Sequence, residues 1–268
     1  MTTQEKLESF ERLLLIMDEL REKCPWDQKQ TIESLRTLTI EEVYELADAI
    51  VTNDIQGVKK ELGDILLHLV FYSKIASESN IFDIGDVINT LIDKLIYRHP
   101  HVFGEVKVAN DREVSDNWEK LKLKEKGGNK TVLEGIPSSL PAMIKAYRIQ
   151  DKARGVGFDW ENRNQVWDKI DEELSELHAE IEQQDTDKME AEFGDFLFSV
   201  INAARLYDIN PENALERTNQ KFIQRFNYLE SKTIQQGKSL KEMSLAEMDI
   251  FWEEAKQVYR QAMKNANE

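Results

Sequence analysis

The apolar residues of this chain recur at helical spacing. Near the start they step by three and four residues, which places them on one face of a helix: Leu7, Phe10, Leu13, Leu14 and Met17. A second run follows the same spacing at Leu62, Ile65, Leu66, Leu69 and Ser73. No segment shows the convincing alternation of apolar and polar residues that is typical of a strand. The pattern predicts an all-α protein in which these faces are buried.

Signals for helix starts agree with this pattern. In a capping box, a Ser or Thr side chain accepts the backbone N–H of a Glu three residues later, and the Glu side chain accepts the N–H of the cap. An asparagine before a proline at the first helical position marks a start of another kind. The sequence predicts such starts at Thr2 with Glu5, Ser244 with Glu247, and Asn210 with Pro211.

The helical pattern stops between Lys126 and Pro141. A glycine pair at 127–128 is followed by Pro137 and then Pro141, and both residue types end helices and favour linkers. We therefore expect an N-terminal module, a linker and a C-terminal module, at 1–126, 127–137 and 138–268.

The two halves carry the same acidic pattern. The first set is Glu41, Glu42, Glu45, Glu61 and Asp64. The second set repeats it 131 residues later, at Glu172, Glu173, Glu176, Glu192 and Asp195. In each set the last Glu and the Asp enclose a glycine and lie within an apolar run. A duplicated helical module is the simplest origin of this repeat.

On helices, each acidic set would converge. Glu172, Glu173 and Glu176 fall on one side of a helix, and Glu192 and Asp195 share a face of the next. Two adjacent antiparallel helices would point these carboxylates into one gap, where they need a cation or must protonate. Because carboxylate oxygens are preferred ligands of Mg²⁺ and Mn²⁺, the pattern predicts a divalent metal site.

A solvated helix face and a di-iron bundle fit the acidic residues less well. With 51 acidic residues in the chain, an isolated Glu-Glu-x-x-Glu string is usually a solvated helix face, but the apolar flanks and the duplication favour a site. A di-iron bundle requires Glu-x-x-His on two helices. None of the four histidines follows a glutamate by three residues: His68, His99, His101 and His178.

Basic and aromatic residues accompany each acidic set. In the second half, Lys221 and Arg225 lie one helical turn apart, and Lys188 opens the helix that carries Glu192. Beside a metal, these cations are suited to hold a polyphosphate. Trp252 is suited either to stack on a nucleobase or to fill a core, and the sequence leaves both open. The first half repeats the set as Lys94, Arg98 and Trp118.

The composition excludes several classes of protein. The net charge is −16 and the pI about 4.8, which argues against a duplex nucleic-acid partner because such binders need a basic surface. Cys24 is the only cysteine, so neither an intramolecular disulfide nor a cysteine zinc site can form. The N-terminus lacks the features of a signal peptide, and no segment is long enough to span a bilayer. We expect a soluble, cytoplasmic protein with no membrane or nucleic-acid partner.

With these residues the chain resembles the MazG family of nucleoside triphosphate pyrophosphohydrolases, within the all-α phosphohydrolase superfamily. The resemblance covers nearly the whole sequence. Besides the acidic sets it includes four segments: Cys24-Pro25-Trp26-Asp27, Arg98-His99-Pro100-His101-Val102-Phe103, Ile136-Pro137-Ser138-Ser139-Leu140-Pro141 and Gly157-Phe158-Asp159-Trp160. Each segment alone is a weak signal, but the ordered set is specific.

The resemblance implies an activity and a site. It implies hydrolysis of nucleoside triphosphates between the α and β phosphates, with Mg²⁺ as cofactor, in tandem four-helix modules that form a homodimer. The residues implied to hold Mg²⁺ are Glu173, Glu176, Glu192 and Asp195, with Glu172 beside them. Those implied to bind substrate are Lys188, Lys221 and Arg225 at the phosphates and Trp252 at the nucleoside.

The C-terminal module is expected to be the catalytic one. The resemblance implies this, and one position agrees: the counterpart of Lys188 in the first half is Gly57, so the first site lacks a phosphate ligand unless Lys59 or Lys60 replaces it. We predict that the first site is a metal-binding or dimerising remnant, formed by Glu41, Glu42, Glu45, Glu61 and Asp64 with Lys94, Arg98 and Trp118.

The expected substrates are nucleoside triphosphates in general. No group of residues is dedicated to recognising a base edge, so we expect broad base specificity and a housekeeping role in the nucleotide pool. One alternative is a non-catalytic helical dimer that binds nucleotide and metal for regulation. Another is an enzyme whose preferred substrate is a damaged or alarmone-like nucleotide.

Overall fold

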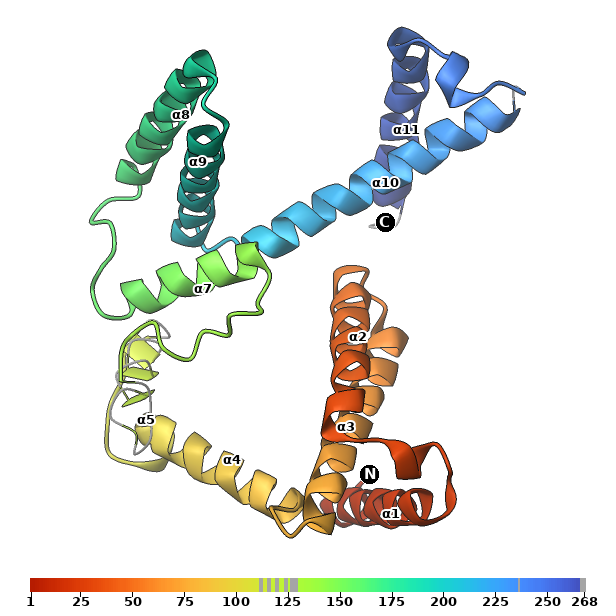
Figure 1. The fold of residues 1–268 in the computed structure, drawn as a ribbon, viewed down its shortest axis with the longest axis vertical. Helices are drawn as coiled ribbons and strands as arrows, with labels where there is room; N and C mark the ends of the chain where they lie inside the picture. Colours follow the sequence, from red (N-terminus) through yellow and green to blue (C-terminus); the bar gives the residue numbers. More distant parts are fainter. Residues whose placement is uncertain are drawn as a thin grey trace. The chain divides into compact units, whose positions relative to one another are not determined.

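The computed structural model describes residues 1–265 except 111–112, 115–116, 119–120, 123–124, 126–129 and 236. Every regular element in this described part is a helix, which confirms the expected all-α class (Figure 1). Within the same part, no helix combines the length and the apolar character needed to cross a membrane. The chain divides into two compact units, Met1–Val132 and Leu133–Glu268.

The first unit is built around a helical hairpin. Its helices and one 3-10 turn have these bounds: α1 Thr3–Lys23, η1 Asp27–Lys29, α2 Ile32–Val51, α3 Ile55–Glu78, α4 Ile84–Arg98 and α5 Pro100–Phe103. Helices α2 and α3 pack side by side, α1 packs against α3, and α4 continues from the end of α3 (Figure 1). The hairpin therefore carries both acidic segments of the first half.

The core of the first unit lies where α1, α2 and α3 meet. Met17 from α1, Leu35 from α2, and Val70 and Phe71 from α3 are almost fully buried in one cluster. Burying such side chains contributes about 1.5–3 kcal/mol each relative to leaving them in water. This cluster holds the hairpin against α1.

The apolar face predicted on α1 is confirmed except at its start. Phe10, Leu13 and Leu14 pack against the cluster that contains Met17. Leu7 is 59% exposed, because only the part of α1 from Phe10 onwards reaches the core.

Helix α3 buries a different face from the one predicted. Ser73 is buried and Ile65 is partly buried, but Leu62, Leu66 and Leu69 are 53%, 39% and 50% exposed. The side of α3 that faces the core is instead the side that carries Val70 and Phe71. Periodicity identified the apolar stripe correctly, but the stripe does not face the core, because none of the described elements of the unit covers it.

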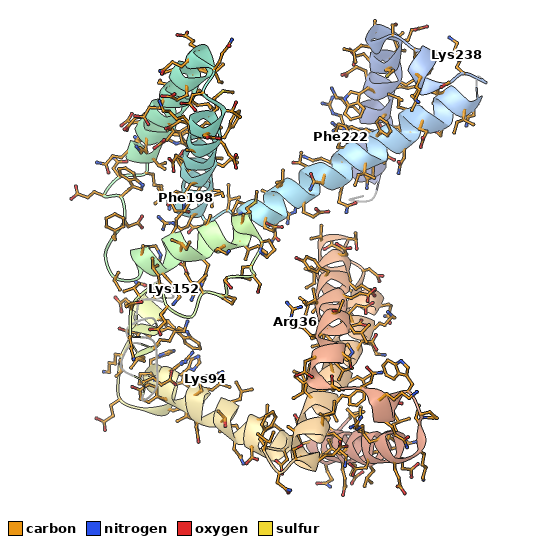
Figure 2. All side chains as sticks on the ribbon, viewed as in Figure 1. Arg36, Lys94, Lys152, Phe198, Phe222 and Lys238 are labelled. Carbon is orange, nitrogen blue, oxygen red and sulfur yellow. The ribbon has the colours of Figure 1, made fainter. Side chains whose placement is uncertain are left out.

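The second unit repeats the hairpin. Its helices and one 3-10 turn have these bounds: α7 Ala142–Arg154, α8 Gln165–Gln183, α9 Thr186–Leu206, α10 Pro211–Gln235, η2 Leu240–Glu242 and α11 Leu245–Asn265. Helix α8 packs on α9, and α10 packs on α11 (Figure 1). Helix α7 packs on α9, where the Gln150 side-chain amide donates a 2.8 Å hydrogen bond to the carbonyl of Phe198. Figure 2 labels Phe198 on α9.

The second unit has two small apolar centres. Val166, Ile170 and Ala203 form a buried cluster between α8 and α9, with Phe196 and Leu206 packed against it. The pair α10 and α11, with the turn between them, buries a further set: Leu229, Thr233, Met243 and Ala255. The acidic hairpin of this unit is therefore held by its own cluster.

The predicted helix starts are confirmed. Thr2 and Glu5 form the capping box of α1. Ser244 and Glu247 exchange the two hydrogen bonds of a capping box at α11. Helix α10 begins at Pro211, and the backbone N–H of Asn213 donates a hydrogen bond to the Asn210 side chain.

The division between the units falls within the predicted linker, 127–137. Residues 127–129 of that linker, and residue 126 at the end of the predicted first module, lie outside the described residues. The described part of the linker, residues 130–137, contains neither an α-helix nor a 3-10 helix. The limits of the two modules stay a prediction.

Candidate active site

Two matching turns set the register of the two acidic hairpins. Asn53 after α2 and Gln184 after α8 both adopt a left-handed backbone, with φ of 57° and 60°. Each is followed by an aspartate, Asp54 or Asp185, whose side chain caps the next helix. A left-handed residue followed by an N-cap reverses the chain within a few residues. The second helix of each hairpin, α3 or α9, therefore begins at the equivalent position after its turn.

Three carboxylates of the second unit converge. One oxygen of each of Glu173, Glu176 and Glu192 lies within 4.8 Å of the other two. Glu173 is only 6% exposed, while Glu176 is exposed and Glu192 is partly buried. The group thus forms between α8 and α9 with one side open to solvent.

The electrostatics of this group show the cost of bringing the acids together. The pKa of Glu192 is raised, first by desolvation and then by repulsion from Glu176, Asp195 and Glu173. Asp195 therefore lies close enough to interact, although it is exposed and outside the group of three. A bound cation would remove this repulsion.

Glu172 lies beside the group rather than in it. Its carboxylate is 3.0 Å from the Lys169 ammonium, which also lies 2.6 Å from Glu173. These hydrogen bonds, first with Glu173 and then with Glu172, raise the pKa of Lys169. Lys169 is not among the predicted site residues, although its spacing of three and four residues before the two glutamates is typical of an ion pair along a helix.

The acidic row on α8 continues to Glu180. This residue follows Glu176 by one helical turn, and its carboxylate lies 3.8 Å from the Lys188 ammonium on α9. One Glu180 oxygen is buried without a hydrogen-bond partner among the described residues. Glu180 is not among the predicted site residues either, because its counterpart in the first half is Ala49 and the repeat therefore does not mark it. Lys188 also contacts the capping carboxylate of Asp185 at 3.5 Å.

The other predicted substrate residues belong to the second helical pair of the unit. Lys221 is exposed on α10, and the Arg225 guanidinium lies 5.8 Å from the ring centre of Trp252 on α11. The Trp252 ring also packs against the Phe222 ring, with 5.1 Å between the two ring centres, and Figure 2 labels Phe222 on α10. Among the described residues, no hydrogen bond or ion pair joins this set to the carboxylates of α8 and α9.

The first unit holds an equivalent group of carboxylates. One oxygen of each of Glu42, Glu45 and Glu61 lies within 4.8 Å of the other two, while Glu41 is exposed and outside the group. Desolvation raises the pKa of Glu42, and repulsion from Asp64, Glu45 and Glu61 adds to the shift. The duplication seen in sequence is therefore a duplication of geometry.

A lysine occupies the neighbourhood of this first group. The Lys60 ammonium lies 2.9 Å from Glu61, 3.6 Å from Glu45 on the other helix, and 3.7 Å from Asp64. The equivalent position in the second group is Ala191, and the lysine beside that group, Lys169, contacts Glu173 on its own helix.

Two of the predicted basic and aromatic residues of the first unit, Arg98 and Trp118, lie against each other. The Arg98 guanidinium lies 5.4 Å from the ring centre of Trp118 and forms an ion pair with Glu125. His99 meets the edge of the same indole at 4.9 Å. Lys94 is exposed on α4 (Figure 2). The structure thus brings Arg98 and Trp118 together.

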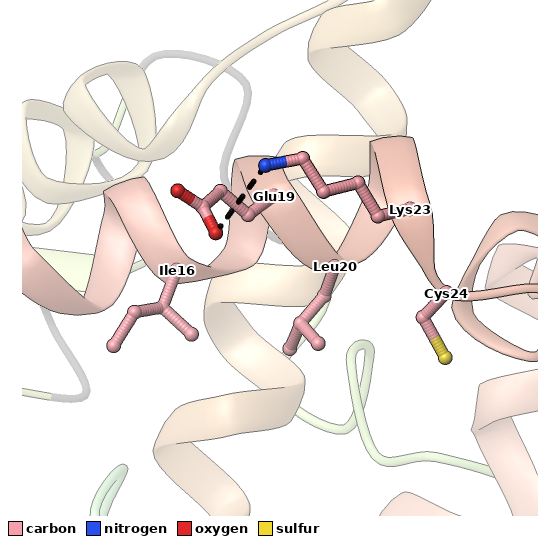
Figure 3. Close-up of a pocket in the computed structure, with 5 residues that line it drawn as sticks. All are labelled: Ile16, Glu19, Leu20, Lys23 and Cys24. Atoms are coloured by element: carbon pink, nitrogen blue, oxygen red, sulfur yellow. Dashed lines mark ion pairs between the residues drawn. The ribbon is translucent and has the colours of Figure 1, made fainter.

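A separate pocket on α1 carries none of these groups. It is lined by Ile16, Glu19, Leu20, Lys23 and Cys24 (Figure 3). The Glu19 carboxylate and the Lys23 ammonium pair across it at 3.6 Å. With residues from one helix end only, the pocket offers no acidic group comparable to those of the hairpins.

The fold and the acidic groups define a class: all-α proteins with a duplicated helical hairpin and convergent carboxylates. The sequence model described as the MazG nucleotide pyrophosphohydrolase domain matches residues 30–103 and 162–229. These two regions contain both carboxylate groups. The chain belongs to the MazG family.

The first two of the following relatives have nearly the same length as this chain, and these two support the assignment. The chain is 45% identical over 250 residues to the nucleoside triphosphate pyrophosphohydrolase/pyrophosphatase MazG of Thermotoga maritima, covering 92% of this chain and 95% of the relative. It is 38% identical to the nucleoside triphosphate pyrophosphohydrolase of Escherichia coli K12, covering 93% and 98%. A crystal structure of a mazG-related protein from Thermotoga maritima matches 43% of this chain and 99% of its own, at 31% identity and a TM-score of 0.38.

Proposed function

We propose that this protein hydrolyses nucleoside triphosphates between the α and β phosphates, with Mg²⁺ as cofactor, giving monophosphate and pyrophosphate. The observation that carries the proposal is the convergence of Glu173, Glu176 and Glu192 in a chain of the MazG family. The names of the Thermotoga maritima and Escherichia coli relatives support the same reaction.

The donor set of the second unit suits Mg²⁺. All of its candidate ligands are carboxylate oxygens, and the group is open on one side, which leaves room for water and phosphate. Glu173, Glu176 and Glu192 would hold the ion, with Asp195 as the fourth ligand one turn after Glu192. When bound there, Mg²⁺ would offset the charge of the phosphates and lower the pKa of an attacking water.

The remaining steps fall to groups beside the carboxylates. Glu172, outside the group of three, is left to accept the proton of the water that attacks the α phosphorus, with Glu173 as the alternative acceptor. Lys188 stands at the start of α9, where its ammonium can neutralise the departing pyrophosphate. Lys221 and Arg225 supply further positive charge, and Trp252 offers a face to the nucleoside.

A homodimer would cover the apolar stripe that each hairpin leaves exposed. Leu62, Leu66 and Leu69 on α3 have equivalents 131 residues later on α9, and these are also exposed, by 48%, 53% and 40%: Phe193, Leu197 and Val200. Contiguous exposed apolar side chains at the same register in both units are typical of an interface. We infer that a second copy of the chain packs on them.

Broad base specificity is part of the proposal. The neighbours of Trp252 are Phe222 and Arg225, which offer stacking and charge rather than a pattern that distinguishes one base edge from another. An enzyme of this kind would serve the general nucleotide pool of the cytoplasm.

The products distinguish this proposal from its alternatives. The purified protein is incubated with each common triphosphate and Mg²⁺, with and without a chelator, and the products are resolved chromatographically. Monophosphate and pyrophosphate that disappear with the chelator support the proposal. Diphosphate and orthophosphate would indicate another hydrolase, and binding without any product would indicate a regulatory module. A much higher kcat/KM for a damaged or alarmone-type nucleotide would narrow the substrate class.

A further inference from the structure

The first carboxylate group contains a lysine that contacts acids on both of its helices. In the first group the Lys60 ammonium contacts two of the three convergent carboxylates, at 3.6 Å from Glu45 and 2.9 Å from Glu61, and also lies 3.7 Å from Asp64. It donates to both oxygens of Glu61, at 2.9 and 3.2 Å. Lys60 therefore joins α2 to α3 at the point where a metal ion would do so.

The second group has no cation in that place. Position 191, equivalent to 60, is an exposed alanine. Lys169 contacts one of the three convergent carboxylates, Glu173, at 2.6 Å, and its other partner, Glu172, lies on the same helix and is not part of the group. Among the described residues, no cation contacts Glu176 or Glu192. The two groups of three thus match in their acids but differ in the lysine that links the two helices.

We propose that Lys60 is a built-in cation of the first group that keeps divalent ions out of it, so that the second group alone holds the metal. This inference rests on the proposed metal role of the second group. To enter the first group, a divalent ion must displace Lys60 from three carboxylates or bind beside its positive charge. Because Lys60 is 65% exposed and partly screened, we expect affinity to fall about tenfold rather than to vanish.

Manganese binding to the full chain tests this inference without any turnover. Isothermal titration with Mn²⁺, in the absence of nucleotide, should give one tight site per chain for the unchanged protein. Lys60→Met keeps the approximate length of the side chain but removes its charge. This variant should bind Mn²⁺ at a second site, with an affinity at least tenfold higher than that of any weak second site in the unchanged protein. Adding Glu45→Gln to Lys60→Met should abolish the new site and thereby locate it.

Three variants serve as matched controls. Lys60→Arg keeps the positive charge and should stay at one tight site. Lys59→Ala removes the neighbouring lysine, which makes no ion pair with these carboxylates in the described part of the chain, and should also stay at one. Ala191→Lys places the cation in the second group and should weaken its tight site about tenfold. Thermal melts by circular dichroism establish that each variant is folded, and Lys60→Gln replaces Lys60→Met if the latter is not.

The outcomes separate this inference from the proposed function. Two equally tight sites in the unchanged protein, or a single site that Lys60→Met leaves single, would overturn the role of Lys60 while the metal role of the second group stands. No site in the unchanged protein but one in Lys60→Met would support Lys60 and refute the second group as the metal site. No binding to any variant would refute both.

Discussion

Glu176 on α8 and Glu192 on α9 belong to different helices, yet one carboxylate oxygen of each lies within 4.8 Å of the other. Such a pair is unfavourable by itself, because desolvation first and then repulsion from Glu176 raise the pKa of Glu192. Under the proposed function both charges would hold Mg²⁺, which accounts for the repulsion being kept. Opposite effects on stability and activity are therefore expected from neutralising one of them.

Replacement Glu192→Gln should stabilise the metal-free protein and inactivate the enzyme. The neutral amide removes repulsion from Glu176 and Asp195, so the melting temperature in a chelator should rise by a degree or more. Loss of a metal ligand should lower pyrophosphate release at least about 100-fold. Calorimetric melts and a pyrophosphate assay measure the two effects. The exposed Glu190→Gln on the same helix is the control, and activity within a few-fold of normal in Glu192→Gln contradicts the site.

Replacement Lys188→Ala should weaken substrate binding more than turnover. Its ammonium lies at the start of α9 beside Glu180, so its removal should raise KM for a triphosphate about tenfold, whereas Lys188→Arg should preserve most of the affinity. Steady-state kinetics separates KM from kcat. Lys241→Ala, at an exposed position of η2, is the control. An unchanged KM would show that Lys188 does not contact the phosphates.

Replacement Leu197→Asp should disrupt the proposed homodimer. The side chain is 53% exposed in the single chain, so a charge there costs the isolated unit little but opposes burial against a second copy. Light scattering after size exclusion should show a shift from dimer towards monomer. The exposed Gln183→Asp at the end of α8 should leave the mass unchanged. A dimer that survives Leu197→Asp would place the interface elsewhere.

The ion pair of Arg21 with Glu78 should make the first unit sensitive to acid. The hydrogen bond from Arg21, 2.6 Å long, is the main cause that lowers the pKa of Glu78 below 4.5. A carboxyl whose pKa is lowered by folding stabilises the protein above its unfolded pKa, and this stabilisation is lost as the pH falls through the folded pKa. Glu78→Gln should therefore lose less stability between pH 6 and pH 3.

The size of this effect is limited by exposure. Because the Glu78 side chain is 38% exposed, we expect a difference of about 1 kcal/mol or less between the two proteins. Urea denaturation at both pH values measures it. Glu11→Gln, at an exposed position of α1, should follow the unchanged protein, and equal acid sensitivity in Glu78→Gln would mean that the pair contributes nothing.

The features that the sequence predicted well are local ones. Helix starts such as Thr2 with Glu5 depend on hydrogen bonds between residues three apart, so the spacing in the sequence is enough to predict them. The convergence of Glu42, Glu45 and Glu61 was expected for a similar reason, because helical spacing and a short turn together fix which side chains face one another.

The features that the sequence did not predict depend on what lies across from a residue. The stripe of Leu62, Leu66 and Leu69 has the periodicity of a buried face, but periodicity does not say which surface covers it. The contact of Lys60 with Glu45 was missed because it joins two helices through a long flexible side chain. No spacing rule within one helix describes such a contact.

The shared turn of the two hairpins has a consequence for how such chains can vary in length. Glu61 and Glu192 each follow their capping aspartate, Asp54 or Asp185, at the same distance along the helix. One inserted residue between cap and acid would rotate the acid about 100° around the helix and remove it from its partners. Insertions and deletions should therefore be absent from this stretch of otherwise divergent homologues, while the connections outside the hairpins are free to gain or lose residues.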